Sequence, residues 1–473
     1  MNFDTMIGLE IHVELSTQSK AFCGCAVAFG GMPNMRCCPV CCGMPGTLPV
    51  LNEMMLEYAV LAGLAFGCEI APDSRFDRKN YFYPDLPKGY QISQQAQPLC
   101  RNGKVAFFLP DGRRETVGIR QIHMEEDTAK QSDIGMDYNR AGVPLIEIVT
   151  CPDLRSGEAV RAFLAHVKSV LEYLEISDCR MQEGSFRVDV NLSVKPSHSD
   201  TLGTRTEMKN LNSFRAVAEA IQHENRRQIQ ILESGGQVRQ ETRRWDEASQ
   251  CSTPMRTKVD AGGYRYFPEP DIPLVCLEAE YVARLKASLP EFAPALAARL
   301  RENYGISPDD ARIITAHKPV AVLFERAAKQ AKSAKEVARW VTGELMYQMR
   351  VQDVEPEKLE LPPAALAVFA DAITNGTINR TVAKQIFGYL FSGGEDVKGY
   401  IETHGLGQVS DEAVILSAVN QVLTAHTKVV SAYQGGQTKL FGFLVGEVMQ
   451  KLGGRGNPTM IRSALQERIG EIP

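Results

Sequence analysis

Apolar and polar residues alternate with a period of two over residues 186–194, which is typical of a β-strand with one buried face. One side of this stretch is apolar, and the other carries Arg187, Asp189, Asn191 and Ser193. A guanidinium, a carboxylate and an amide in a row favour a site for phosphate and metal over a face that meets only bulk water. The pattern therefore predicts a strand whose polar side has a chemical role.

The same alternation recurs over residues 7–15, 119–127, 144–149 and 204–210. The polar faces of these stretches hold Glu10, His12 and Glu14, then Gln121, His123 and Glu125, then Glu147, and finally Arg205, Glu207 and Lys209. Any one of these strands could simply turn an ordinary outer face to solvent. Acidic residues are poor strand formers, however, so their recurrence indicates a shared purpose. If the five strands pair in one sheet, that face becomes a concave, charged floor.

The polar faces offer ligands for a divalent cation. Carboxylates with an imidazole suit Mg²⁺ or Mn²⁺, and Glu10 and His12 stand two residues apart on one predicted strand. Such ions, together with Lys and Arg, are what phosphoryl transfer from ATP requires. The chain has neither a Gly-x-x-x-x-Gly-Lys-Ser/Thr nor a Gly-x-Gly-x-x-Gly loop. A nucleotide is therefore expected on a sheet face.

The character of the chain changes near residue 290. Before it, strand signals dominate and two helices are predicted, over about 157–175 and 213–232. Beyond it, strand signals vanish and the apolar spacing is helical. The predicted fold class is α+β, with an antiparallel sheet in residues 1–290. Two all-helical domains are expected to follow, over 291–405 and 406–473.

Composition sets the remaining limits. A chain of 473 residues should hold two to four domains, and its net charge of −5 argues against a large, uniformly basic surface. Residues 427–473 nevertheless carry six Lys and Arg against three Glu, and Lys451 and Arg455 flank a glycine loop that could meet a phosphate. We find no apolar run of membrane-spanning length and no signal peptide, so a cytoplasmic protein without membrane contact is expected.

Six of the twelve cysteines fall between Cys23 and Cys42. Cys23-Gly-Cys25, followed about a dozen residues later by a Cys-x-x-Cys, can close a tetrahedral thiolate site, and four thiolates favour structural Zn²⁺. The register stays open at this point, because Cys37 or Cys42 could replace a neighbouring ligand.

Several longer motifs then match a known family in order along nearly the whole chain. They include Gly8-Leu-Glu-Ile-His-Val13, Lys79-Asn-Tyr-Phe-Tyr-Pro-Asp-Leu-Pro-Lys-Gly-Tyr90, His123-Met-Glu-Glu-Asp127, Pro144-Leu-Ile-Glu-Ile-Val149 and Lys209-Asn-Leu-Asn-Ser-Phe214. Together they closely resemble the GatB subunit of the bacterial and organellar aspartyl/glutamyl-tRNA amidotransferase.

The resemblance implies a chemistry and its partners. ATP would phosphorylate the side-chain carboxylate of Glu-tRNA(Gln) or Asp-tRNA(Asn), and ammonia would displace the phosphate to form the amide. The ammonia would come through a tunnel from a separate amidase subunit, and a small third subunit would hold the complex together. The implied sheet is akin to the catalytic fold of glutamine synthetase.

The resemblance also implies residue roles. The implied Mg²⁺ ligands are Glu10, His12 and Glu125, with Glu147 and Asp189 as further ligands and Glu126, Glu183 and Glu207 as possible substitutes. Lys79, Arg187 and Lys209 would hold the transferring phosphate beside Asp189, and Asn191, Glu207 and Asn210 would bind ATP or substrate. Cys23, Cys25, Cys38 and Cys41 would bind zinc, and Lys451 and Arg455 would contact tRNA.

Two rival functions remain in view. A non-catalytic RNA-binding scaffold would have no need of Glu10, His12 and Glu125, so Glu10→Ala should leave it intact. A free-standing ATP-dependent carboxylate–amine ligase would have no use for the helical tail. Its rate should therefore survive removal of the residues after Leu406.

Overall fold

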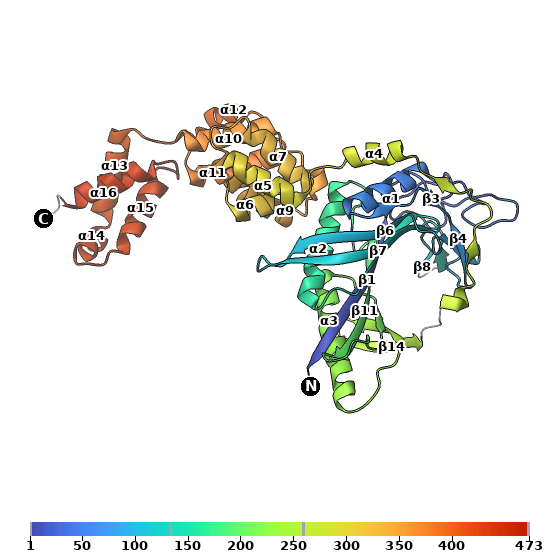
Figure 1. Ribbon diagram of the computed structural model, residues 1–473. Helices are drawn as coiled ribbons and strands as arrows, with labels where there is room; N and C mark the ends of the chain where they lie inside the picture. The colour runs from blue at the N-terminus through green and yellow to red at the C-terminus, as the bar shows by residue number, and fades with distance from the viewer. Residues whose placement is uncertain (1, 133–134, 258–260, 471–473) are drawn as a thin grey trace. The chain divides into compact units, whose positions relative to one another are not determined.

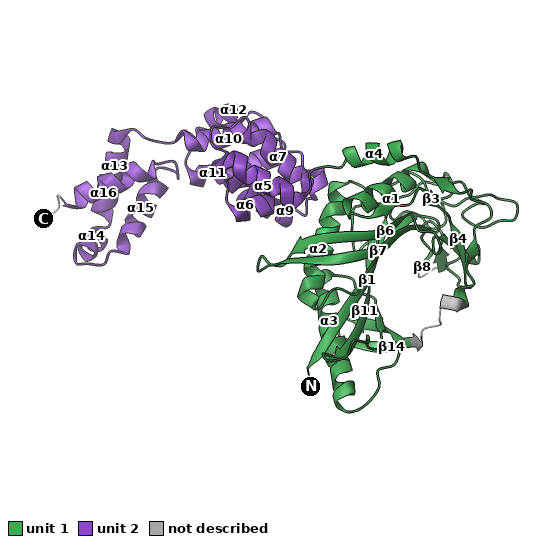
Figure 2. Ribbon diagram, viewed as in Figure 1, with its two compact units in different colours: residues 1–290 green, residues 291–473 purple. Residues whose placement is uncertain are grey.

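The computed structural model describes residues 2–132, 135–257 and 261–470. The chain divides into two compact units, residues 1–290 and 291–473 (Figure 2). The first unit combines sheets and helices, and the second is helical throughout its described residues, which confirms the predicted fold class. The three-part domain division stays a prediction.

A nine-stranded sheet is the centre of the first unit, with the strand order β14-β13-β12-β11-β1-β10-β7-β6-β2. Its strands are β1 Phe3–Glu14, β2 Glu69–Ile70, β6 Cys100–Phe108, β7 Arg114–Glu126, β10 Pro144–Thr150, β11 Phe186–Pro196, β12 Thr206–Lys209, β13 Glu241–Asp246 and β14 Cys251–Thr257. The five strands predicted from alternation are all present, as β1, β7, β10, β11 and β12.

One pair departs from the predicted antiparallel arrangement, because β12 and β13 run parallel. The 20-residue helix α3, Phe214–Glu233, lies between them in sequence. A helical crossover of this length returns the chain in its original direction, whereas a short hairpin would reverse it.

The two faces of the sheet differ as the alternation requires. Ile7, Leu9, Ile11 and Val13 of β1 are all buried. The helices α2 (Gly157–Tyr173) and α3 run along one face of the sheet (Figure 1), and α1 (Glu53–Ala65) packs against β6 and β7. Burying each large aliphatic side chain stabilises the fold by about 1.5–3 kcal/mol. The helices therefore take the apolar face and leave the polar face for other uses.

A three-stranded sheet, in the order β15-β4-β5, packs beside β7. It consists of β15 Phe267–Pro268, β4 Asp77–Asn80 and β5 Tyr90–Ser93. The guanidinium of Arg78 fastens it by donating to the two oxygens of Glu269 at 2.6 and 3.1 Å and to Asp271 at 2.8 Å. This clamp fixes the position of Lys79, the next residue on β4.

The remaining elements of the unit are β3 Asp73–Ser74 paired with β16 Val275–Cys276, β8 Lys130–Ser132 paired with β9 Gly135–Asp137, the 3₁₀ turn Ala261–Tyr264 and α4 Ala279–Ala287.

The second unit contains helices only in its described residues. They are α5 Ala293–Tyr304, α6 Pro308–Ile314, α7 Lys318–Ala328, α8 Ala334–Trp340, a π-helical turn Val341–Leu345, α9 Met346–Val351, a 3₁₀ turn Pro356–Lys358, α10 Pro363–Thr374, α11 Arg380–Phe391, α12 Val397–Thr403, α13 Glu412–Ala425, α14 Thr427–Gln434, α15 Leu440–Lys451 and α16 Pro458–Gly470. Helices α13 to α16 share an apolar cluster that includes Val419, Leu444 and Leu465. Within the described residues no single helix is long and apolar enough to cross a membrane, although α13 and α14, bent by 89°, pass that test as a pair.

Candidate active site

The first group of possible metal ligands comes from three neighbouring strands. His12 lies on β1 opposite Glu147 on β10, and Glu125 lies on β7. The Nε2 atom of His12 is 3.6 Å from Glu125 Oε1 and 3.4 Å from Glu147 Oε2. One ligand atom from each of the three residues lies within 4.8 Å of the others. We call His12, Glu125 and Glu147 the histidine cluster.

Glu125 is the buried member of the histidine cluster, while His12 and Glu147 are partly exposed. Glu125 is only 3% exposed and accepts a hydrogen bond from Ser93 Oγ at 3.2 Å. His123 Nε2, on the strand beside Glu147, is 3.3 Å from Glu147 Oε2. Burial favours the neutral imidazole, but Glu147 and Glu125 outweigh it and raise the pKa of His123 to about 10. Positive charge therefore has a favourable place here, and a divalent cation could supply it.

The second group lies on β1, β11 and β12. The register sets Glu10 opposite Asp189, and one ligand atom from each of Glu10, Asp189 and Glu207 lies within 4.8 Å of the others. Lys209 Nζ forms an ion pair with Asp189 and lies 3.5 Å from Glu207 Oε1. Burial opposes the ammonium charge, yet Asp189 and Glu207 together raise the pKa of Lys209. We call Glu10, Asp189 and Glu207 the carboxylate cluster.

The structure therefore divides the single magnesium set expected from the sequence. His12, Glu125 and Glu147 come together, whereas Glu10 and Asp189 stand in the other cluster with Glu207, for which the sequence predicts ATP or substrate binding and, as an alternative, metal ligation. The strand register is the cause. Residues two apart on one strand are about 6.6 Å apart, so Glu10 and His12 reach different neighbours across the sheet.

Lys79 stands apart from the nine-stranded sheet, on β4. Its Nζ donates to Gln91 Oε1 at 3.3 Å and lies 5.6 and 5.2 Å from the ring centres of Tyr81 and Tyr264. Gln91 in turn donates to the backbone oxygen of Glu126 at 2.7 Å. In the part of the chain that the structure describes, Lys79 thus contacts an amide and two aromatic rings, so its charge is available to a ligand.

Arg187 is held by protein carboxylates. Its Nη1 donates to Asp127 Oδ2 at 2.7 Å and to Glu14 Oε1 at 3.2 Å. Burial and the charge of Asp127 raise the pKa of Glu14 to about 9, while Arg187 and Arg140 overcome burial to hold the pKa of Asp127 low. Sequence reasoning missed this group, although Glu14 is visible as the third polar residue of its strand face. Arg187 is thus braced by two protein carboxylates, and its contact with the transferring phosphate stays a prediction.

The two predicted asparagines have different surroundings. Asn191 Nδ2 donates to Glu10 Oε1 at 2.9 Å, whereas its Oδ1 is buried and has no hydrogen-bond partner among the described residues. Asn210 has a φ of 67°, a left-handed conformation that asparagine tolerates, and its Nδ2 donates to Trp245 O at 2.9 Å. Asn191 is therefore placed to meet a ligand, and Asn210 holds the turn after β12.

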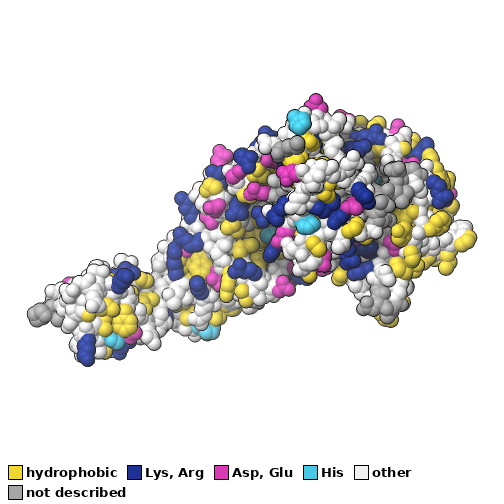
Figure 3. All heavy atoms as spheres, turned by 90° about the horizontal axis from the view of Figure 1, so that it is seen from below, with side chains coloured by type: hydrophobic (Ala, Val, Ile, Leu, Met, Phe, Trp, Pro, Cys, Tyr) yellow, Lys and Arg dark blue, Asp and Glu magenta, His cyan; other side chains and the backbone are white. Residues whose placement is uncertain are grey.

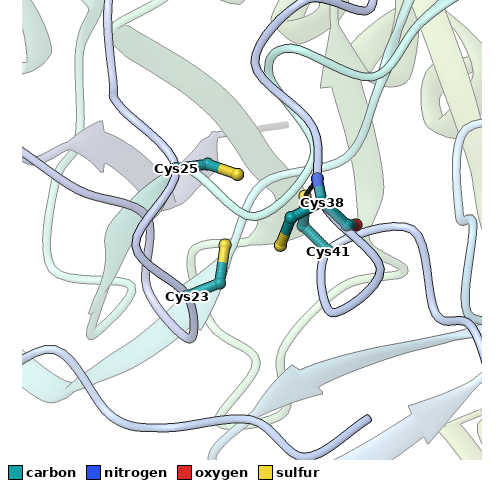
Figure 4. Close-up of side chains that lie close together, drawn as sticks. All are labelled: Cys23, Cys25, Cys38 and Cys41. Carbon is teal, nitrogen blue, oxygen red and sulfur yellow. Dashed lines mark hydrogen bonds between the residues drawn. The ribbon is translucent and has the colours of Figure 1, made fainter.

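The sulfur atoms of Cys23, Cys25, Cys38 and Cys41 lie within 4.8 Å of one another, and Figure 4 shows the four side chains converging from two loops. A hydrogen bond from the Cys23 thiol, with the Cys38 N–H and Lys20, lowers the pKa of Cys41 against the effect of burial. Cys37 and Cys42 are not in the group that the described residues form. We call these four residues the thiolate centre, and its donor set fits Zn²⁺.

The two predicted tRNA contacts lie in the second unit. Lys451, at the end of α15, is exposed and donates to Gln421 Oε1 at 2.7 Å. Arg455 is half-buried and donates to the Gly405 carbonyl at 2.6 Å. Arg455 therefore has a structural bond as well as a charge, while the ammonium of Lys451 faces solvent.

Two family models match most of the chain. Residues 5–283 match the family model of the GatB/GatE catalytic domain, and residues 322–469 match that of the GatB domain. The first unit, which contains the nine-stranded sheet, therefore corresponds to a GatB/GatE catalytic domain.

Relatives narrow the class further. The chain is 48% identical to the GatB subunit of the aspartyl/glutamyl-tRNA(Asn/Gln) amidotransferase of Caldicellulosiruptor bescii over 100% of both chains. It is also 48% identical to the corresponding protein of Lachnoclostridium phytofermentans, over 99% of both. That of Thermoanaerobacter sp. (strain X514) is 47% identical over 100% of both. The chain belongs to the GatB family of aspartyl/glutamyl-tRNA(Asn/Gln) amidotransferase subunits.

Proposed function

We propose that this chain is the synthetase subunit of a tRNA-dependent amidotransferase. It phosphorylates the side-chain carboxylate of Glu-tRNA(Gln) or Asp-tRNA(Asn) with ATP and then forms the amide with ammonia. The observation that carries the proposal is the pair of acidic clusters on one sheet face, flanked by Lys79 and Lys209. Full-length similarity to subunits named for this reaction supports it.

The reaction explains why such a face is needed. A carboxylate is a poor electrophile, so one of its oxygens first attacks the γ-phosphorus of ATP while the bond to ADP breaks. Ammonia then adds to the acyl carbon, the carbon–oxygen bond to phosphate breaks, and a proton is lost to give the amide. Both steps gather negative oxygens together, and preorganised positive charge stabilises that arrangement.

Each cluster supplies ligands that suit Mg²⁺, namely carboxylate oxygens, joined in the histidine cluster by one imidazole nitrogen. Magnesium bound there would offset the charge of the ATP oxygens and the substrate carboxylate. Glu10, Asp189 and Glu207 would hold one ion, and the histidine cluster would hold another. Lys79 would contact the transferring phosphate, and Asn191 would direct its buried Oδ1 to the ligand.

The relatives are named as part of a larger enzyme, and the surface of this chain supports docking of partners. Exposed apolar side chains crowd the loops between residues 29 and 50, where Phe29 is 68%, Met32 74%, Met35 70% and Val50 73% exposed. Hydrophobic side chains also gather at the right-hand end of the first unit in Figure 3. Contiguous apolar patches of this kind mark protein interfaces. We assign the partners as the amidase subunit, which supplies ammonia, and the small third subunit, with the misacylated tRNA contacting Lys451 and its surroundings.

The thiolate centre has a structural part in this proposal. Four sulfur atoms within 4.8 Å of one another suit Zn²⁺, and an ion held by all four would have no open position for substrate. The bound ion would join the loop of Cys23 and Cys25 to that of Cys38 and Cys41.

Direct supply of ammonia tests the proposal without the amidase reaction. The chain with its partners would receive Glu-tRNA(Gln), ATP, Mg²⁺ and ammonium, and ADP release and Gln-tRNA would be scored separately. Wild type should give both products, and Glu125→Gln should lose both by roughly 10²–10³-fold, the usual effect of removing a group that stabilises transition-state charge. Glu115→Gln, at the far end of the same strand, is the matched control.

Three results would count against the proposal. Full turnover in Glu125→Gln would remove the histidine cluster from the chemistry, and absence of ADP from wild type would favour an RNA-binding scaffold. A rate that survives deletion of residues 406–473 would favour a free-standing ligase.

A further inference from the structure

Lys20 is a buried lysine that the proposed reaction does not use. Its side chain is among the largest fully buried ones, with a residue exposure of 1%. The Nζ donates to the Tyr138 carbonyl at 3.1 Å and approaches Cys41 Sγ at 3.6 Å. Among the described residues its hydrogen-bond partners are thus a carbonyl oxygen and a sulfur, not a carboxylate. A buried ammonium normally has an anionic partner, so its surroundings need explanation.

The sulfur of Cys41 is the one acidic atom that the ammonium touches among the described residues. A carbonyl oxygen offers only a dipole, whereas a thiolate offers a full charge at close range. Four thiolates around one divalent cation leave a net charge of about −2 on the centre. An ammonium next to one of the sulfurs would offset half of that charge where water is excluded.

The backbone holds Lys20 in place at two points. Its N–H donates to Cys25 O at 2.9 Å, and the N–H of Ala21 donates to Gly142 O at 2.8 Å. Gly142 has a φ of 87°, and a Cβ there would stand 3.4 Å from Lys20 Cδ, 3.5 Å from Cys41 Cβ and 3.8 Å from Glu126 Oε2. A glycine at this point thus lets the aliphatic part of the Lys20 side chain pass close to Cys41 of the thiolate centre.

We propose that Lys20 is the buried counter-cation of the thiolate centre, a positioning residue that retains a thiophilic divalent ion, Zn²⁺, by offsetting the charge on Cys41. This inference rests on the proposed zinc site and adds a residue outside the four ligands.

Zinc retention tests the inference apart from catalysis. Purified full-length wild type and Lys20→Met would be titrated with a chromophoric chelator, and the zinc dissociation constant would be measured by competition. We expect Lys20→Met to raise that constant by roughly 10- to 100-fold, the usual effect of removing a partner of a metal ligand. Lys168→Met is the control, since Lys168 Nζ likewise donates to a backbone carbonyl, that of Cys179 at 3.2 Å, but lies away from the centre.

The outcomes separate the two claims. Wild type that binds no zinc would remove the zinc site and this inference together, while leaving the amide chemistry to its own assay. Wild type that binds zinc, with an unchanged constant in Lys20→Met, would overturn the role of Lys20 alone.

A second variant covers the case in which Lys20→Met fails to fold. In a Cys41→Ser background the ammonium has lost its anion, so adding Lys20→Met should raise the thermal midpoint above that of Cys41→Ser. A lower midpoint in the double variant would contradict the assigned role.

Discussion

Glu14 offers a prediction whose size can be worked out from its surroundings. Its carboxyl lies beside Asp127 and accepts from Arg187, and burial and Asp127 raise its pKa from 4.5 to about 9. Glu14 therefore stays protonated in the folded protein at neutral pH, while the unfolded chain ionises it. The stability that it contributes is complete below about pH 4.5 and is lost as the pH rises through about 9. Glu14→Gln keeps the neutral shape and cannot ionise.

The magnitude follows from the width of that pH window. Each pH unit between the two pKa values changes the free energy of unfolding by at most about 1.4 kcal/mol. Between pH 6 and pH 8.5 the upper bound is thus roughly 3.4 kcal/mol. The side chain is 20% exposed, and Arg187 favours the ionised form, so about half of that, roughly 2 kcal/mol, is our expectation. A change of this size moves the thermal midpoint of a large domain by several degrees.

The assay is thermal unfolding of wild type and Glu14→Gln across that pH range. The advantage of the variant over wild type should grow steadily from pH 6 to pH 8.5, because wild type loses stability throughout that range. Glu219→Gln is the control, because Arg215 lowers the pKa of Glu219 and removes it from the window. A constant difference between wild type and Glu14→Gln, or one that shrinks with rising pH, would refute the reasoning.

Three further predictions concern other parts of the site. Lys209→Met leaves Asp189 and Glu207 without their ammonium, so tRNA-dependent ADP release in steady-state assays should fall by about 10²-fold or more; an unchanged rate would contradict its role. Asn210→Ala should lower the free energy of unfolding by about 2–3 kcal/mol in denaturant titrations, because alanine is strained at a left-handed φ and the hydrogen bond to Trp245 is lost. Asn210→Gly should lose only the hydrogen bond, because glycine adopts this φ without strain. Stripping zinc with a chelator should expose four additional reactive thiols, and a smaller number in a thiol titration would reduce the ligand set.

Much of the fold could be predicted from alternation alone. Residues 7–15 and 186–194 each have one face to bury, and β1 and β11 do bury Ile11 and Val190 while turning their acidic faces the other way. The helices were predictable because a serine precedes each: the side chains of Ser156 and Ser213 accept a hydrogen bond from the N–H of Ala159 and Ala216, respectively. The parallel pairing of β12 with β13 was not, because it depends on where a helix returns the chain.

The candidate site could be predicted as a set of residue types but not as a geometry. Whether Glu10 meets Asp189 or Glu147 depends on the register between strands more than 130 residues apart in sequence, and local patterns do not encode that register. The same limit hid the pairing of Arg187 with Asp127. Cysteine spacing alone could not decide whether Cys37 or Cys42 belongs to the ligand set, because the ligands are determined by how two loops come together in space.

The central claim is that two separate acidic clusters on one sheet face hold divalent ions for phosphoryl transfer. A titration of the chain and its partners with Mn²⁺, followed by electron paramagnetic resonance, tests it most directly. We predict two sites in wild type, loss of one in Glu125→Gln, and loss of the other in Glu207→Gln. Two sites that survive both substitutions, or a single site that both remove, would contradict the account.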